Sequence, residues 1–287
     1  MNRKRSSGSK KSKKKLAKLA DKHLLYEASV QSAEAYIELL SKIYKKKRKR
    51  KIRSIREDFC GTARLCYEWV LADKKIECWG VDLDQDVLDW GVANHAPFAD
   101  KAASRVNLIC GDVRNSETPQ VDALIAFNFS YYCFKERSEL LNYFKVTHDN
   151  LNDEGVLFLD LMAGPKSYDD DYEEREVNHE RNFYGDPIPP FTYVWEQDKF
   201  NQLTHEMTCY IHFEFPDGSK MKKAFTYEWR IWTPPELVDL LKEAGYSKVD
   251  FYLQGWDDDL DETDDNFIPR TKYNELDTWF GYLVATK

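Results

Sequence analysis

The sequence has no long apolar run and no closely spaced cysteine pair. No stretch of about 18 consecutive apolar residues occurs in its 287 residues, so it predicts no membrane-spanning helix. Residues 1–22 are basic and lack the apolar segment of a secretory signal. The six cysteines are isolated, and the six histidines are scattered without the spacing of a zinc site. We therefore expect reduced thiols, no metal site, no membrane contact and a cytoplasmic location.

The loop after the first predicted strand is poor in glycine. Residues 54–58 are typical of a strand, and a helix is predicted to run through residues 65–70. A dinucleotide site needs Gly-x-Gly-x-x-Gly so that backbone amides close on a pyrophosphate. This loop has only Gly61, with Ala63 and Leu65 where the later glycines would fall. The pattern therefore disfavours an NAD-dependent oxidoreductase.

A second predicted strand ends about twenty residues further on, at Asp82. A carboxylate at such a strand end can accept hydrogen bonds from both hydroxyls of a ribose. In an open α/β sheet the ligand lies over these strand ends and also meets amides at the start of a helix. The two stretches together predict a nucleoside ligand.

Five landmarks, in order, resemble the class I S-adenosylmethionine-dependent methyltransferases of the small-molecule type. They are Glu57-x-x-Cys60-Gly61-Thr62-Ala63, Asp82 and the stretches 106–113, 121–130 and 151–160. The resemblance implies S-adenosylmethionine as cofactor, with Asp112 at the adenine amino group and the end of the stretch 121–130 in the loop that lines the methyl-transfer site. It implies cofactor contacts from Tyr26, Glu57, Cys60, Gly61, Thr62, Asp82, Leu83, Asp112, Val113, Asn128 and Phe129.

Ala63 departs from the family pattern, which usually has a second glycine at this position. An alanine is tolerated there if its φ angle is negative, and otherwise the cofactor loop is strained. The departure leaves open that the cofactor site is altered or inactive.

The predicted helices and strands alternate as a doubly wound α/β sheet requires. We expect a seven-stranded Rossmann-like sheet built from residues 53–165 and 233–287. Residues 1–18 are predicted to form a disordered basic tail, and residues 19–52 are predicted to form helices. The resemblance implies that these helices close over the cofactor. The strands are expected at residues 54–58, 76–82, 105–110, 121–127, 155–161, 249–253 and 278–285.

Residues 166–232 are predicted to form an insert. Prolines and an acidic run favour a long loop or lid at 163–190. Three antiparallel strands are expected after it, at 191–195, 203–215 and 222–232. Such an insert resembles the cover over the acceptor in small-molecule methyltransferases. A second acidic stretch, 257–265, lacks the spacing of a calcium loop and is expected to be a solvated loop.

The acceptor side is less determined by the sequence. Candidates for holding an acceptor or for catalysis are Tyr131, Tyr132, Arg230 and Trp232, and Arg230 would suit a carboxylate-bearing acceptor. Packing in a small core explains Arg230 and Trp232 equally well. A base for an amine nucleophile could be His179, His205 or one of the tyrosines.

Two alternatives to a small-molecule methyltransferase remain. The basic tail and the run Lys45–Lys51 could dock RNA or protein, although the net charge of -8 disfavours a nucleic-acid groove in the folded part. The chain could also be a non-catalytic regulator with a methyltransferase fold. The sequence does not indicate the oligomeric state.

Overall fold

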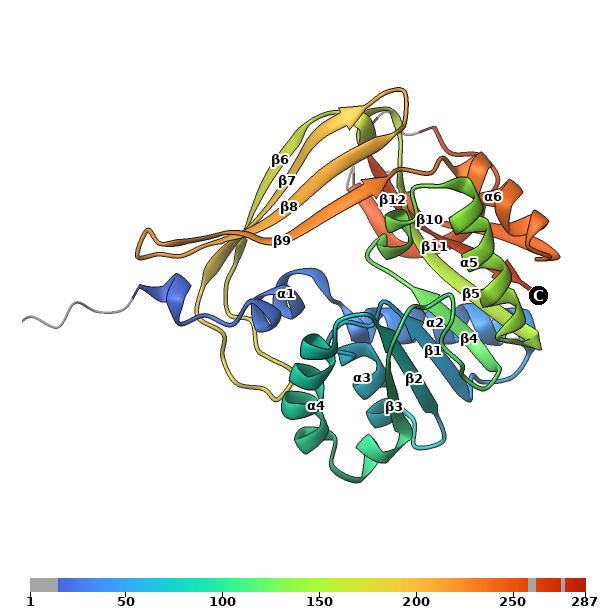
Figure 1. Cartoon of the computed structure of the whole chain (residues 1–287), viewed down its shortest axis with the longest axis horizontal. Coiled ribbons are helices and arrows are strands. Elements are labelled where there is room, and N and C mark those ends of the chain that lie inside the picture. The colour runs from blue at the N-terminus through green and yellow to red at the C-terminus, as the bar shows by residue number, and fades with distance from the viewer. Residues whose placement is uncertain (1–14, 258–261, 275–276) are drawn as a thin grey trace, which may run out of the picture.

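The computed structural model describes residues 15–257, 262–274 and 277–287. Eight strands form the main sheet in the order β11-β10-β12-β5-β4-β1-β2-β3 (Figure 1). Their bounds are β1 (Ser54–Asp58), β2 (Glu77–Asp82), β3 (Val106–Cys110), β4 (Val121–Ala126), β5 (Leu151–Ala163), β10 (Lys248–Asp257), β11 (Glu262–Arg270) and β12 (Trp279–Thr286).

The five neighbouring strands β3, β2, β1, β4 and β5 run parallel. Strands β12, β10 and β11 continue the sheet by antiparallel pairing. All seven expected strands are present. The eighth, β11, corrects the expectation of a solvated loop at 257–265, because Glu262 already begins a strand. Residues 258–261 of that stretch lie outside the described residues.

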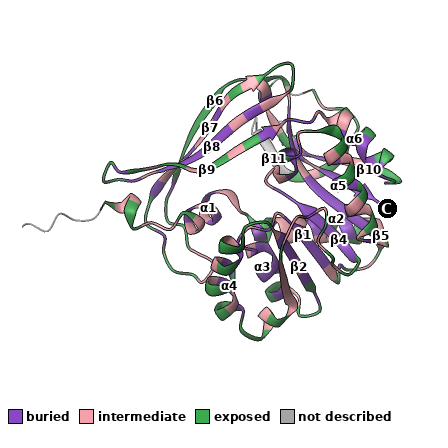
Figure 2. Cartoon of the chain, viewed as in Figure 1, coloured by how far each residue is buried: buried purple, intermediate pink, exposed green. Residues whose placement is uncertain are grey.

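Helices cover both faces of this sheet, as a doubly wound fold requires. Ala123 and Ile125 of the fully buried β4 pack toward α2 (Ala33–Arg48), α3 (Arg64–Ala72) and α4 (Gln85–Ala99). Leu124 and Ala126 pack toward α5 (Arg137–Asp149) and α6 (Pro234–Glu243). Figure 2 shows the resulting buried centre at β1, β4 and β5. None of the helices formed by described residues is long and apolar enough to cross a bilayer.

The insert is a separate antiparallel sheet in the order β6-β7-β8-β9. Its strands are β6 (Asp171–Val177), β7 (Phe191–Asn201), β8 (Glu206–Glu214) and β9 (Lys220–Arg230). Three of them were expected, whereas β6 forms within the segment that was expected to be a lid loop. Figure 1 shows this sheet extending from above α1 (Lys22–Val30) to the end of the main sheet near β12.

Part of the expected basic tail is structured. Residues Leu16–Lys18 form a 3-10 turn that packs on the hairpin between β8 and β9. The amide of Leu16 donates a 2.9 Å hydrogen bond to Asp217, and the amide of Ala17 donates one of 3.0 Å to Ser219. Residues 1–14 lie outside the described residues, so the expectation for them stays a prediction.

Candidate functional site

The order in which successive strands are added to the main sheet reverses between β1 and β4. β1 pairs with β2 on one side and with β4 on the other. Ligands of open α/β sheets bind over the carboxyl ends of the strands at this switch point. Glu57 and Asp82 lie at the ends of β1 and β2, and Asp160 lies level with the end of β4 because Leu159 pairs with Ala126. The sequence therefore brings three carboxylates to one edge of the sheet.

The loop after β1 is tightly wound. Phe59, Gly61 and Ala63 have φ angles of 58°, 55° and 56°. Ala63 therefore does not have the negative φ under which an alanine is tolerated at this position, and a left-handed alanine costs about 1 kcal/mol. The side chains of Cys60 and Thr62 are buried in the loop. What the loop offers to a ligand is therefore its main chain, above all at Gly61, where an added Cβ would meet no atom within 4 Å.

Asp82 is tied to this loop. Its Oδ2 accepts a 2.8 Å hydrogen bond from the amide of Gly61, and its Oδ1 accepts one of 3.0 Å from the amide of Asp84. The next residue, Leu83, is 70% exposed. A carboxylate, an exposed leucine and an open stretch of main chain thus lie together over β1 and β2, as a nucleoside site requires.

Glu57 lies buried at the end of β1. The thiol of Cys66 donates a 3.1 Å hydrogen bond to its Oε2. Burial raises the pKa of Glu57 to about 8, although the hydrogen bond from Cys66 opposes the shift. A cation bound nearby would favour the ionised carboxylate. Glu57 is therefore suited to a positively charged ligand.

Asp112 lies at the edge of the same surface, since the amide of Gly111 donates a 2.9 Å hydrogen bond to the Asp82 carbonyl, whereas Val113 is buried in the core. The guanidinium of Arg114 binds both oxygens of Asp112, at 2.7 Å from Nη2 to Oδ2 and at 3.0 Å from Nε to Oδ1. This contact lowers the pKa of Asp112. Arg114, which no sequence signal indicates, occupies the carboxylate that the resemblance assigns to adenine.

The loop after β4 is held by Asp160. Its two oxygens accept hydrogen bonds of 2.6 Å and 3.0 Å from the amides of Asn128 and Phe129. Both residues have left-handed φ angles, 56° and 54°. Burial raises the pKa of Asp160 to about 7, and the two amides oppose this shift. The loop is thereby fixed in a strained conformation beside a cavity.

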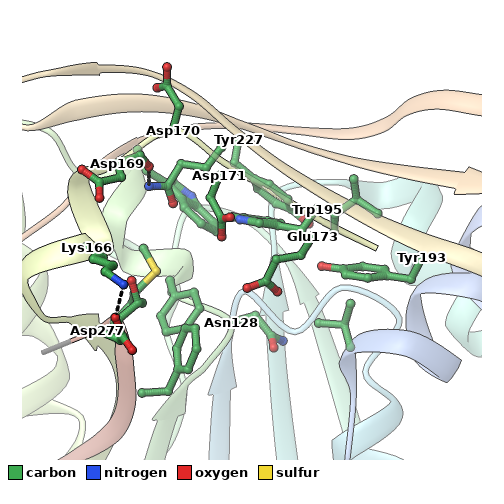
Figure 3. A pocket seen from close by; sticks show the side chains of 18 of the residues that line it. Asn128, Lys166, Asp169, Asp170, Asp171, Glu173, Tyr193, Trp195, Tyr227 and Asp277 are labelled. Carbon is green, nitrogen blue, oxygen red and sulfur yellow. Dashed lines mark hydrogen bonds and ion pairs between the residues drawn. The ribbon is translucent and has the colours of Figure 1, made fainter. Parts of the chain in front are cut away.

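The cavity lies between the insert and the ends of β4 and β5, and its volume is about 530 Å³ (Figure 3). Its walls come from α1, the loop after β4, the start of the insert, the inner face of β7 to β9, and the residues around the start of β12. They comprise Tyr26, Val30, Asn128, Phe129, Met162, Lys166, Asp169, Asp170, Asp171, Glu173, Tyr193, Trp195, Gln197, Ile211, Tyr227, Trp229, Asp277, Thr278 and Phe280.

Helix α1 joins the cavity to the loop after β1. The structure places Tyr26 on the cavity wall, where its ring lies 4.9 Å from that of Phe225. One residue further, the buried Glu27 accepts a 2.5 Å hydrogen bond from Thr62 and lies 2.8 Å from Nε2 of His95. Sequence reasoning missed this contact, because only the fold brings the three residues together.

The tyrosines proposed to hold an acceptor are core residues. Tyr131 and Tyr132 have no exposed surface. Their hydroxyls donate to the main-chain oxygens of Asp160, at 2.8 Å, and Met162, at 3.2 Å. Neither lines the cavity. They therefore anchor the loop after β4 on β5, and a direct role with an acceptor is not compatible with this placement.

Arg230 and Trp232 also lie away from the cavity. The guanidinium of Arg230 stacks on Trp232 at 3.8 Å and donates a 2.9 Å hydrogen bond to the Lys135 carbonyl. Trp232 is buried and donates to the Phe134 carbonyl. The packing interpretation holds for both residues, so Arg230 is not placed to bind a carboxylate-bearing acceptor.

The histidines proposed as bases do not line the cavity either. His179 is exposed in the loop after β6, and His205 packs with Tyr168 and Phe200 at the hairpin between β7 and β8. Among the described residues, no cluster of three or more His, Cys, Asp or Glu side chains could hold a metal ion.

Much of the basic run 45–51 is engaged inside the fold. Lys47 lies 2.5 Å from Asp250, Arg48 donates to the Gly155 carbonyl at 3.1 Å, and Arg50 lies 2.9 Å from Asp122. These cations fasten α2 and the following turn to the sheet. The run is therefore a weaker docking surface than its composition indicates.

No protein-family model and no curated protein sequence matches the chain. Solved structures do match. An S-adenosylmethionine-dependent methyltransferase from Clostridium acetobutylicum aligns at 16% identity and a TM-score of 0.64, over 91% of this chain and 96% of that chain.

Two further structures align over similar lengths. An amino pentose methyltransferase from Micromonospora echinaspora, solved with S-adenosylmethionine bound, gives 14% identity and a TM-score of 0.65 over 92% of this chain and 95% of that one. A sugar N-methyltransferase from Streptoalloteichus aligns at 16% identity and a TM-score of 0.60, over 100% of this chain and 98% of that chain. The chain thus has the Rossmann-like fold of these methyltransferases, antiparallel insert included.

Proposed function

We propose that the chain is an S-adenosylmethionine-dependent methyltransferase that acts on a small-molecule acceptor. One observation carries the proposal. A nucleoside-type surface over β1 and β2 lies beside a cavity over β4 and β5, and the loop of Asn128 and Phe129 forms part of the cavity wall. The shared fold and the cofactor bound in one of the similar structures support it.

The residues present fit the cofactor. Asp82 is placed to accept hydrogen bonds from ribose hydroxyls, and the open main chain at Gly61 leaves room for the amino-acid end. The exposed Leu83 offers an apolar surface to adenine, and Glu57 lies where a positive charge would stabilise its ionised form. When bound, S-adenosylmethionine supplies an activated methyl group, whose bond to sulfur breaks as the acceptor atom bonds to carbon.

The chain's own residues then have to align the two ligands and keep water out. Such positioning can contribute about 7–11 kcal/mol to lowering a barrier. Phe129 and Phe280 stack at 5.9 Å on the floor of the cavity, and the insert covers it from the other side. A covered cavity of this size favours a small acceptor over a polymer.

The two alternatives have less support. Docking of RNA or protein through basic segments loses part of its basis because Lys47, Arg48 and Arg50 bind within the fold. A non-catalytic regulator is favoured by the strained Ala63, but the strain is about 1 kcal/mol and is small beside the stability of a domain.

Calorimetric titration with S-adenosylmethionine and S-adenosylhomocysteine tests the proposal. We expect the wild-type chain to bind both, and Asp82→Ala to lose binding because the ribose hydroxyls lose their acceptor. Asp86→Ala is the matched control, since Asp86 is an exposed acid in the first turn of α4. Absence of binding by the wild-type chain would overturn the cofactor assignment and favour the regulator. Salt-sensitive RNA binding lost on deletion of residues 1–22 would favour the docking alternative.

A further inference from the structure

Strand β6 turns charged side chains toward the cavity. Asp171 pairs with Gln197, Glu173 with Trp195 and Arg175 with Tyr193. Side chains of directly paired residues share one face of a sheet, and Gln197, Trp195 and Tyr193 all line the cavity. The alternate residues of β6, among them Glu174, therefore lie on the outer face.

The cavity holds more negative than positive charge. Its charged lining residues are Asp169, Asp170, Asp171, Glu173, Asp277 and Lys166. Lys166 forms an ion pair with Asp277. Arg175, which lines the adjoining cavity of about 390 Å³, donates to the Ser29 carbonyl. In the described part of the chain, no lysine or arginine forms an ion pair with Asp171 or Glu173.

Aromatic rings share the cavity wall with the carboxylates of Asp171 and Glu173, both of which are exposed. Trp195, directly opposite Glu173, lies 5.9 Å from Trp229, which stacks on Tyr227 at 4.6 Å. Figure 3 shows the Glu173 carboxylate directed toward Asn128, whereas Asp170 is turned away. Aromatic faces and unpaired carboxylates both attract cations, while they disfavour an anion. This is the opposite of the carboxylate-bearing acceptor considered for Arg230.

We propose that the cavity binds an acceptor that carries a protonated amine, and that the carboxylate of Glu173 takes up the proton that the nitrogen must lose. The inference rests on the proposed function, because it names the acceptor of the same site. It also assigns a base, in place of His179, His205 and the tyrosines.

The proton step balances without a further reactant. An N–H bond of the ammonium breaks, its electron pair stays on nitrogen, and the proton bonds to an oxygen of Glu173. The nitrogen lone pair then receives the methyl group, so the product nitrogen carries the positive charge that the sulfonium had. Asn128, on the loop that the resemblance assigns to the methyl-transfer site, lines the same cavity as Glu173.

Burial raises the pKa of Glu173, and the neighbouring Asp171 raises it further by its charge and a hydrogen bond, while Arg175 opposes the shift. A raised pKa makes a carboxylate a better proton acceptor. The other titratable groups on the cavity wall are Tyr193 of β7, Tyr227 of β9, Tyr26 of α1, Asp169, Asp170 and the Lys166–Asp277 pair.

Three probes of one shape test the inference: benzylamine, benzyl alcohol and benzoate, titrated at pH 7.5 into the cofactor-free chain. We expect benzylammonium to bind about tenfold more tightly than benzyl alcohol, and benzoate to bind more weakly than either. Equal affinity for the three probes, tighter binding of benzoate, or no benzylammonium binding at millimolar concentration would overturn the inference.

Matched variants locate the effect. Glu173→Gln should weaken benzylammonium binding about fivefold to tenfold, and Glu174→Gln on the outer face of the same strand should leave it unchanged. Benzylammonium affinity of the wild type should fall as the pH drops and Glu173 is protonated, and this pH dependence should vanish in Glu173→Gln. Unaltered binding or an unaltered pH profile in Glu173→Gln would remove that residue from the proposal.

The same preparations are titrated with S-adenosylmethionine. Glu173→Gln should bind it like the wild type, because Glu173 lies on the insert and not at the loop after β1. Benzylammonium binding without S-adenosylmethionine binding would leave the amine site standing and overturn the methyltransferase. Binding of S-adenosylmethionine without binding of benzylammonium would leave the methyltransferase proposal standing and overturn the amine acceptor.

Discussion

The hydroxyl of Thr62 donates a 2.5 Å hydrogen bond to the buried carboxylate of Glu27. The bond joins α1, which lines the cavity under the insert, to the loop that follows β1. His95 of α4 lies 2.8 Å from the same carboxylate oxygen. The two halves of the candidate site are therefore connected through one buried carboxylate.

We expect Thr62→Val to lower the free energy of unfolding by about 2 kcal/mol. Valine has nearly the same shape but cannot donate, so a buried carboxylate oxygen loses one of its two partners. Urea denaturation measures the change. Thr226→Val, at an exposed position of β9, is the control and should change stability by less than about 0.5 kcal/mol. Equal effects of the two substitutions would contradict the importance of the contact.

Glu57→Gln should gain stability relative to the wild type as the pH rises. The pKa of Glu57 is about 8 in the folded chain against an ordinary value of 4.5. Below pH 4.5 the carboxyl is protonated in both states. Between pH 4.5 and 8 the unfolded chain releases a proton that the folded chain retains, so wild-type stability falls.

The glutamine does not titrate, so the difference between Glu57→Gln and wild type should be small at the low end of this window and largest near pH 8. Urea denaturation across the window measures it. Glu117→Gln, at an exposed position, is the control and should show no such trend. A difference that is constant with pH would show that Glu57 is not protonated in the folded chain.

Ala63→Gly should stabilise the chain by up to about 1 kcal/mol. Alanine is strained at a φ of 56°, whereas glycine adopts this conformation freely. Thermal denaturation compares it with Ala93→Gly, an exposed position in the interior of α4, where glycine should destabilise by about 0.5–1 kcal/mol. Destabilisation by both substitutions would mean that the loop does not have the described conformation.

Gly91→Ala should destabilise the chain by about 1–3 kcal/mol and weaken cofactor binding. A Cβ at Gly91 would lie 2.1 Å from the Thr62 carbonyl oxygen, so α4 would have to move away from the loop after β1. Denaturation and calorimetry measure the two effects. Val92→Ala, at the exposed neighbour, should leave both nearly unchanged. A stable Gly91→Ala variant would contradict this close packing.

Local signals in the sequence were sufficient for most of the fold. Runs of apolar residues ending in Asp82 and Asp112 predict parallel strands and their functional edge. Thr233 and Glu236, three positions apart in the sequence, form the capping box that starts α6. These signals succeed because strands and helix caps depend on neighbours within a few positions.

Strand β6 was missed because its inward residues are as polar as its outward ones. Asp171 and Glu173 face the cavity and Arg175 faces the adjoining one, while Tyr172 and Glu174 alternate with them, so no apolar period appears. The same acidic side chains that remove the apolar alternation of the strand also make the cavity acidic. A strand that lines a polar site carries no ordinary sequence signature.

The contacts of Glu27 were beyond sequence reasoning for a different reason. It lies 35 positions from Thr62 and 68 from His95, and nothing local indicates which carboxylate is buried. The burial of Tyr131 and Tyr132 was equally hidden, because it follows a left-handed turn at Asn128 and Phe129 that the sequence does not indicate. Burial of polar side chains is decided by tertiary contacts, which the sequence does not display.

The insert interrupts the chain between β5 and α6, so under the proposed function donor and acceptor recognition are encoded in separate, uninterrupted stretches. Residues 54–113 contain the nucleoside surface, and residues 166–230 contain most of the cavity wall. Natural variation on the inner face of β6 to β9 can therefore redirect the enzyme to new acceptors while the donor site stays constant. Related chains should differ most in this stretch, and exchanging it between them should transfer acceptor choice.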